Sequence, residues 1–220
     1  MQKLLLNFFK PEILRDELSI LPFFHRLSFA VSCCERILPI YHAFCAMENW
    51  GDFSIPRKSI DIIWATLQGK EIDSKKVEKY REYCGHDNIF PDAYDFGDAY
   101  YCYEAQEVLM AVRATLAAYS KPKIGDIINV VRCTRNIIES SITTRDQFFH
   151  LSIQETDSEI FEQEFLKHSL AIREITKEEE DLKILRKEEI LTPNSLLFLQ
   201  GSSQQEGREL IALLNSWAET

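Results

Sequence analysis

Few glycines occur in this chain, and the motifs that bind nucleotides are missing. The seven glycines among 220 residues form neither a GxGxxG nor a GxxxxGK phosphate-binding loop. Lys and Arg are also scarce beside Asp and Glu, 25 against 35, so a net charge of -10 offers no basic field to a phosphate backbone. These shortages argue against nucleotide-dependent chemistry and against nucleic-acid binding.

Long apolar runs are absent as well. No stretch approaches the ~18 apolar residues of a membrane span, and the apolar part of the N-terminus between Lys3 and Lys10 is too short for a signal peptide. At least four of the six cysteines fall inside helical apolar patterns, where a reduced thiol acts as a small hydrophobe. We therefore expect a soluble, cytoplasmic protein without disulfides.

Metal-ligand motifs are missing too, since the chain contains no CxxC, HExxH or Asp-rich calcium loop. Cys34, His42 and Cys45 lie close in sequence. On a straight helix, however, Cys34 and Cys45 would be roughly 16 Å apart, too far for one ion with ligand bonds of ~2.0–2.3 Å. We expect no metal and no other cofactor.

Helical periodicity dominates what is present. Between residues 26 and 47, apolar side chains recur at intervals of four and three, the pattern of a core-facing helix in which Pro39 predicts a kink or a break. Further helices are predicted from Ser54 to Gly69, and over residues 73–85, 102–121 and 124–139. We also predict one long solvent-edge helix over 157–189 and a terminal helix after a Gly-Ser break at 201–203. The fold class is all-α, a compact single-domain bundle of about seven to nine helices.

A group of charged residues surrounds the turn between the first two predicted helices. We interpret it as a structural polar corner, in which the acids form ion pairs or helix caps with nearby arginines; its members are Glu35, Arg36, Asp52, Arg57 and Asp61. An alternative is a hydrolase or lyase whose carboxylates near Asp52 and Asp61 perform acid–base catalysis.

A second group lies between Asp87 and Val112, where acids alternate with aromatic residues and no Lys, Arg or His occurs. Tyrosines among carboxylates suit the binding of a basic protein, because the rings contribute area at low entropy cost while the acids select the partner. The candidate partner-binding residues are Tyr94, Asp95, Asp98 and Tyr101. The alternative is that the acids cap a helix and the rings anchor a loop to the core.

Four blocks of sequence carry a family resemblance: CCERILPIYHAF, WGDFSIPRKSIDIIWATL, AYYCYEAQEVL and SSITTRDQF. In this order they resemble the bacterial DUF416 (domain of unknown function 416) family, over residues 20 to 199. The resemblance implies compact, all-helical cytoplasmic proteins without an established activity and with a suggested link to signalling. It implies no catalytic residues. We divide the chain into an N-terminal arm (1–20), a DUF416-like helical domain (21–199) and a C-terminal helical extension (200–220) packed on the same domain.

The most consistent function is a non-enzymatic protein-interaction or signalling-associated module with a basic protein partner and no nucleic-acid or membrane ligand. An immunity protein that neutralises a toxin is one alternative, because acidic surfaces can cover cationic partners. The carboxylate enzyme is the other. A homodimer would also be compatible with the near-heptad apolar stripe along residues 161–185.

Overall fold

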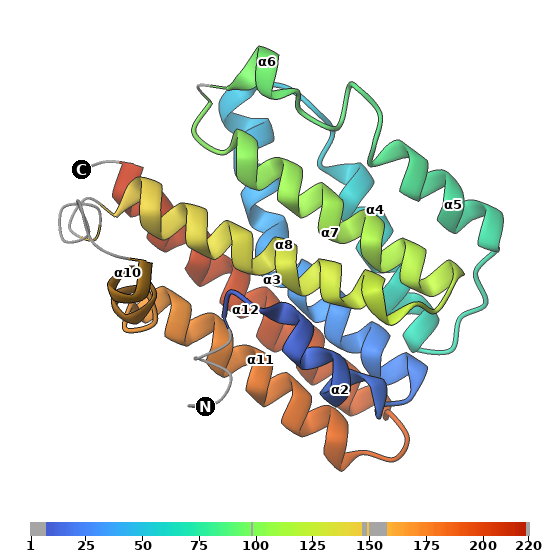
Figure 1. The fold of residues 1–220 in the computed structure, drawn as a ribbon. Coiled ribbons are helices and arrows are strands. Elements are labelled where there is room, and N and C mark those ends of the chain that lie inside the picture. Colours follow the sequence, from blue (N-terminus) through green and yellow to red (C-terminus); the bar gives the residue numbers. More distant parts are fainter. Residues whose placement is uncertain (1–7, 98, 147–148, 150–157, 219–220) are drawn as a thin grey trace.

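All regular secondary structure in the described part of this computed structural model, residues 8–97, 99–146, 149 and 158–218, is helical (Figure 1). The all-α prediction is confirmed. These ranges hold ten α-helices and one 3-10 helix, more than the predicted seven to nine because some are very short. The elements are η1 (Pro11–Ile13), α2 (Leu14–Ser19), α3 (Phe23–Glu48), α4 (Ser54–Leu67), α5 (Ser74–Tyr83), α6 (Ala93–Phe96), α7 (Cys102–Ser120), α8 (Ile124–Arg145), α10 (Ser158–Phe165), α11 (Ser169–Lys187) and α12 (Pro193–Ala218).

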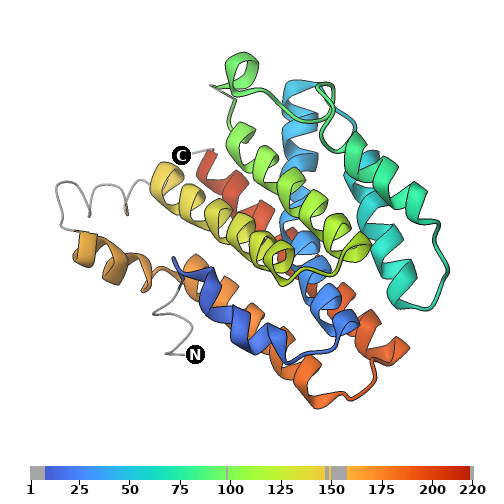
Figure 2. The ribbon, with the colours of Figure 1, turned by 45° about the vertical axis from the view of Figure 1, so that its right-hand side comes forward.

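Helix α3 forms the centre of the bundle. It packs against α4, α7, α8, α11 and α12, and Figure 2 shows it running between the α7–α8 pair and α12. Every residue from Leu27 to Leu38 is buried, so the helix is enclosed on all sides rather than on the single face that the spacing predicts. Its charged residues, Glu35 and Arg36, can be enclosed because both form ion pairs inside the protein.

Pro39 does not divide α3, which continues from Phe23 to Glu48. Because proline has no N–H, the carbonyl of Glu35 lacks its helical donor. Helix α12 approaches at this point through Gly207, where a Cβ atom would lie 2.9 Å from the Glu35 oxygen and 2.8 Å from the Arg36 oxygen. The missing side chain thus allows two helix backbones to come together.

The predicted Gly-Ser break is wrong, because α12 runs through Gly201 as one helix. Most of its buried residues recur at intervals of three and four along one face; these are Leu196, Leu199, Ser203, Gly207, Leu210 and Leu214. One exposed glycine costs about 1 kcal/mol of helix propensity, which this packing outweighs. Helix α12 therefore contributes to the same hydrophobic core as the other long helices.

The predicted helix over 157–189 is two helices, separated where the ring of His168 accepts a hydrogen bond from the Leu170 N–H (3.1 Å) and caps α11. Helix α11 lies at the edge of the bundle (Figure 1), with Lys183 and Arg186 exposed, but it buries more than a solvent-edge helix is expected to. Its apolar stripe is covered within the chain, with Ile175, Leu182 and Leu185 all buried, so this face is not open to a second copy.

No helix in the described residues is both long enough and apolar enough to cross a membrane.

Candidate functional site

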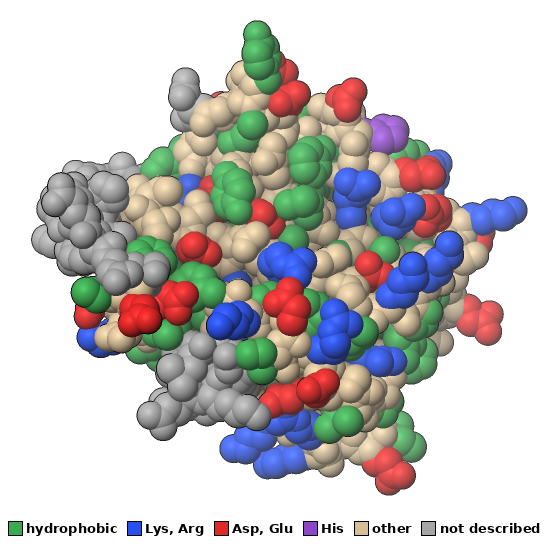
Figure 3. Space-filling view, viewed as in Figure 1, with side chains coloured by type: hydrophobic (Ala, Val, Ile, Leu, Met, Phe, Trp, Pro, Cys, Tyr) green, Lys and Arg blue, Asp and Glu red, His purple; other side chains and the backbone are tan. Residues whose placement is uncertain are grey.

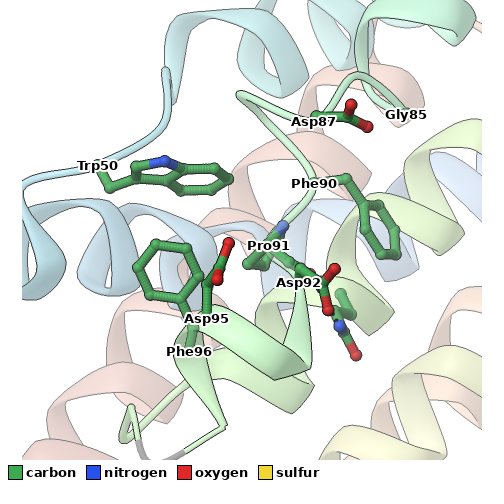
Figure 4. Close-up of a pocket in the computed structure, with 9 residues that line it drawn as sticks. Trp50, Gly85, Asp87, Phe90, Pro91, Asp92, Asp95 and Phe96 are labelled. Carbon is green, nitrogen blue, oxygen red and sulfur yellow. Dashed lines mark hydrogen bonds between the residues drawn. The ribbon is translucent and has the colours of Figure 1, made fainter.

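A cleft of about 710 Å3 opens between the end of α3 and the segment that leads into α6 (Figure 4). Its walls combine aromatic rings with carboxylates. The lining residues are Trp50, Gly85, Asp87, Phe90, Pro91, Asp92, Asp95, Phe96 and Gln106. We call this site the acidic cleft.

Local backbone geometry places Trp50 at the cleft. Helix α3 ends at Asn49, which adopts a left-handed conformation (φ 49°), and Gly51 follows with φ 82°. Both angles favour Asn and Gly. The turn lays the Trp50 ring against Phe44 and Phe96, with ring centroids 6.0 and 4.9 Å away.

The opposite wall is held by two hydrogen bonds to its backbone. The Tyr41 hydroxyl donates to the Ile89 carbonyl (2.7 Å), and the Gln106 amide donates to the Pro91 carbonyl (2.8 Å). These bonds join the segment before α6 to α3 and α7. The cleft is therefore built on two long core helices, although most of its lining comes from a loop.

Helix α6 projects from the end of the bundle (Figure 1). Asp92 caps it by accepting a hydrogen bond from the Tyr94 N–H (2.8 Å). Phe96 points inward and packs on Phe44 (5.5 Å), whereas Tyr94 is 94% exposed. The four-residue helix thus carries one anchoring ring and one free ring.

The acidic cleft has no neutralising cation among its lining residues. Asp87, Asp92 and Asp95 are exposed, and none of them belongs to an ion pair in the described residues. Figure 3 shows acidic side chains over α6 and a gathering of Lys and Arg over the side that carries α5. The end of the molecule at α6 is accordingly negative, which favours cationic ligands.

The predicted partner-binding residues separate in the structure. Tyr94 and Asp95 both lie at the surface of α6, while Asp98 lies outside the described residues. The prediction that Tyr101 contacts a partner is wrong. Tyr101 is 1% exposed, and its hydroxyl donates a hydrogen bond to the Asn215 side chain (2.8 Å). Burial raises the pKa of this phenol. It faces α12 from the start of α7, so it cannot contact a partner.

Sequence reasoning missed Trp50, which lies 45 positions before Asp95 and belongs to a block interpreted as structural. The available signal was an aromatic residue directly followed by glycine at the end of a strongly patterned helix. That signal indicates a turn with a ring beside it, but not which distant segment the ring meets.

At the predicted polar corner, Glu35 lies buried between two donors. The Arg57 guanidinium donates two hydrogen bonds to its carboxylate (2.7 and 2.8 Å), and the Trp64 indole donates a third (2.8 Å). Arg57 also pairs with Asp61 (2.8 Å), whose side chain is 56% exposed. Glu35 and Asp61 thus share one arginine, but they are not buried as a pair.

The two other corner residues act elsewhere. Asp52 is exposed and accepts a hydrogen bond from the Ser54 N–H (2.8 Å) at the start of α4. The prediction that Arg36 belongs to the polar corner is wrong. Its side chain points to α11 and pairs with Glu174 (2.5 Å) and Asp181 (3.0 Å). Successive residues of a helix point about 100° apart, so neighbours in sequence face different helices.

The pairs of Arg36 belong to a larger buried ion network that sequence reasoning missed. Arg135 of α8 pairs with Glu178 (2.5 Å), and Lys177 pairs with the same Asp181 that Arg36 contacts. All of these side chains are nearly inaccessible to solvent. Helix α11, which its charge predicted at the solvent edge, is thus joined to α3 and α8 by buried charges.

The thiols and metal-type ligands of α3 are dispersed. Burial raises the pKa of Cys34 to about 12, which keeps the thiol protonated and a poor nucleophile. His42 is exposed and lies against the Phe53 ring, with centroids 4.4 Å apart. Within the described residues, no three His, Cys, Asp or Glu side chains are placed to hold one metal ion.

Comparisons with known proteins agree on one family. A family model described as "Protein of unknown function (DUF416)" matches residues 14–212. The uncharacterized protein YjaG of Escherichia coli (strain K12) is 34% identical over 89 residues, which cover 39% of this chain and 42% of that protein. YjaG of Salmonella typhimurium is 33% identical over the same share. The matched part therefore spans less than half the length of these relatives.

A solved structure shares the fold. The crystal structure of a DUF416 family protein from Shewanella baltica OS155 superimposes with a TM-score of 0.73 and covers 88% of this chain and 94% of that chain. Sequence identity between the two is 21%, so the likeness shows a common fold and nothing about activity.

Proposed function

Since the chain belongs to the DUF416 family, whose function is unknown, we propose a function from its own surface: it is a non-enzymatic module that binds a basic protein through α6. The observation that carries this proposal is the placement of Tyr94. Its ring is 94% exposed on a projecting helix surrounded by carboxylates.

An exposed ring on a held backbone is a suitable binding anchor. Tyrosine is enriched among the few residues that dominate binding energies at interfaces. Phe96 packs into the core from the same short helix, so Tyr94 is presented on a backbone that is already ordered. Ordering the anchor before binding lowers the entropy lost on association.

The charges beside Tyr94 define the partner. A second hollow, of about 570 Å3, lies next to α6, and Glu48, Tyr94 and Tyr100 are among its lining residues. Together with the acidic cleft it gives α6 a negative setting, and Asp95 borders both hollows. A partner of complementary, basic charge is attracted and oriented by such a surface.

The proposal includes a cytoplasmic location and a signalling-associated role. Free thiols support the location, because all six cysteines are unpaired and five of them are buried. A partner held by one ring and a few carboxylates would exchange readily, which suits signalling. The same surface would serve an immunity protein, and the identity of the partner separates these two roles.

The carboxylate enzyme gains no comparable support. Glu35 is held between Arg57 and Trp64, and Asp61 is exposed and paired with the same arginine. Catalysis by paired acids requires one carboxyl group to stay protonated while the other is charged. Here both carboxylates contact the same guanidinium and only Glu35 is buried, so the two acids do not share an enclosed site in which to divide these roles.

Quantitative affinity capture from the native host tests the proposed surface. The tagged wild-type chain is compared with a Tyr94→Ala/Asp95→Asn variant and with Ile190→Ala, which truncates another highly exposed side chain (79%) at a distant site. Each enriched protein is then purified, and its Kd is measured by calorimetry.

We expect a basic protein whose affinity falls at least about tenfold in the double variant, as for a hot-spot residue, and stays unchanged in Ile190→Ala. Equal affinity of all three chains for every captured protein contradicts the proposal.

A further inference from the structure

The acidic cleft has the chemistry of a pocket for a guanidinium group. Building on the function proposed above, we infer that it receives an arginine side chain from a flexible basic segment of the partner protein. Tyr94 would then supply the exposed contact beside the pocket, and the cleft would supply selectivity.

Aromatic faces provide the first part of this chemistry. The rings of Trp50 and Phe96 lie 4.9 Å apart at an angle of 50° on one side of the cleft, and Phe90 lies on the other (Figure 4). A guanidinium is planar and weakly hydrated, so it stacks on aromatic faces better than an ammonium does. The rings favour arginine over lysine.

Unpaired carboxylates provide the second part. Figure 4 shows the Asp95 carboxylate directed toward the Trp50 ring, with Asp87 and Asp92 along the other wall. The chain pairs most of its buried acids with its own arginines, as with Glu104 and Arg145 (2.6 Å). Among the described residues, these three aspartates have no such cation. Their position around a ring-lined hollow therefore leaves a place for a cation from outside.

The size of the cleft indicates what carries the arginine. A volume of about 710 Å3 lies in the range of ligand pockets and exceeds the needs of one side chain, so adjacent backbone enters as well. Gln106 lines the cleft and donates its amide N–H to Pro91, so its side-chain oxygen is the atom that we propose accepts an N–H from such a segment. Arg113 packs its guanidinium against Gly85 at the edge but does not line the cleft.

NMR titration of the 15N-labelled full chain tests the inference. The probe is acetyl-Gly-Arg-Gly-Arg-Gly-amide, and matched peptides replace arginine by lysine or by neutral citrulline. The indole N–H of Trp50, assigned with a Trp50→Phe variant, reports on the cleft. We expect saturable shifts with the arginine peptide, about three- to tenfold weaker binding of the lysine peptide, and no saturation with citrulline.

Charge variants provide the matched comparison. Asp87→Asn/Asp95→Asn removes two exposed carboxylates from the cleft and is expected to weaken the arginine peptide at least about tenfold, since hydrogen bonds to charged groups are worth more than neutral ones. Glu189→Gln removes an exposed carboxylate from the loop between α11 and α12, at the other end of the bundle, and should leave the Kd unchanged. Higher salt should weaken binding to the wild type.

Several results would overturn the pocket. Citrulline binding as tight as arginine, shifts confined to other helices, or no shift at millimolar peptide would each do so. Shifts could also grow with protein concentration in the absence of peptide and vanish in Lys75→Glu/Lys76→Glu. That result would show that α5 of a second copy occupies the cleft, and it would overturn the arginine pocket.

The two proposals fail separately. A captured protein that requires Tyr94 but is unaffected by Asp87→Asn/Asp95→Asn leaves the proposed function standing and removes the arginine pocket. Peptide binding that depends on these aspartates, with no partner captured, retains the pocket and removes the proposed function.

Discussion

The close approach of α12 to α3 predicts that two glycines in one helix respond oppositely to the same substitution. Gly207 and Gly201 both lie in the interior of α12. A Cβ at Gly207 would meet the Arg36 and Glu35 carbonyl oxygens at 2.8 and 2.9 Å, and the Pro39 ring at 3.1 Å. A Cβ at Gly201 would meet nothing within 4 Å.

The expected magnitudes follow from two opposing effects. Alanine gains about 1 kcal/mol over glycine in a helix interior, and Gly201→Ala should show this gain almost in full. At Gly207 the same gain is opposed by contact with two backbone carbonyls, which cannot rotate away as a side chain could. Overpacking of a core typically costs about 1–3 kcal/mol. Because the atoms in contact belong to the backbone, the cost of Gly207→Ala should lie at or above the upper limit of this range. We expect a net loss of about 2 kcal/mol.

Urea unfolding and thermal unfolding, both followed by circular dichroism at 222 nm, measure the two changes. For a chain of this size, 1 kcal/mol corresponds to a Tm shift of about 2–4 °C. Gly207→Ala should therefore lower the Tm by about 4–8 °C, and Gly201→Ala should raise it by about 2–4 °C. The slope m, by which the free energy of unfolding falls with urea concentration, should stay constant because the surface exposed on unfolding does not change. Equal stability of the two variants would refute the backbone contact between α3 and α12.

Three further predictions concern buried polar groups. Arg36→Met should destabilise the fold by about 3–5 kcal/mol in urea unfolding, because it removes the cation that buried Glu174 pairs with and leaves Asp181 with Lys177 alone. Arg173→Met, which breaks partly exposed pairs, should cost less than about 1 kcal/mol. At pH 8, disulfide reagents followed by mass spectrometry should modify half-buried Cys45 before Cys34, whose pKa is raised to about 12; rapid labelling of Cys34 would contradict its burial. Burial raises the pKa of Glu139 in the folded protein. Its charged form therefore destabilises the fold at pH values above this raised pKa, and the effect is absent at pH values below the pKa of the unfolded chain. Glu139→Gln should therefore raise the Tm at pH 8 but not at pH 4.

Local sequence patterns predicted a helix correctly where apolar residues are buried and capping residues stand at its ends. Helix α4 begins at Ser54, where the sequence places it, and its buried Ile60, Ile63 and Trp64 follow the expected stripe. The continuity of α12 was not predicted. Gly201 lowers the local helix propensity, but contacts between α12 and α3 outweigh that loss. A single sequence contains no sign of that neighbour.

The errors at α11 have a different origin. Glu174, Glu178 and Asp181 recur at intervals of four and three, which is the spacing of one helix face. A charged face normally indicates solvent, but here it meets Arg36 and Arg135 from two other helices. Burial of a charge depends on its partner, and the partner is more than a hundred residues away for Arg36. Periodicity therefore located the face correctly and assigned it to the wrong environment.

The same reasoning explains why the candidate site was found only in part. The composition of residues 87–112 indicated an acidic, aromatic surface, and Tyr94 and Asp95 belong to one. It could not distinguish Tyr94 from Tyr101, because both are tyrosines beside acids, and the second is buried where its hydroxyl bonds Asn215 of α12. Glu178 and Asp95 illustrate two kinds of acid in this protein. Glu178 pairs with Arg135 and is buried, whereas Asp95 has no ion-pair partner among the described residues and lies beside exposed Tyr94. A partner that fills the acidic cleft must then bring the positive charge itself, which is why arginine, lysine and citrulline peptides are the decisive comparison.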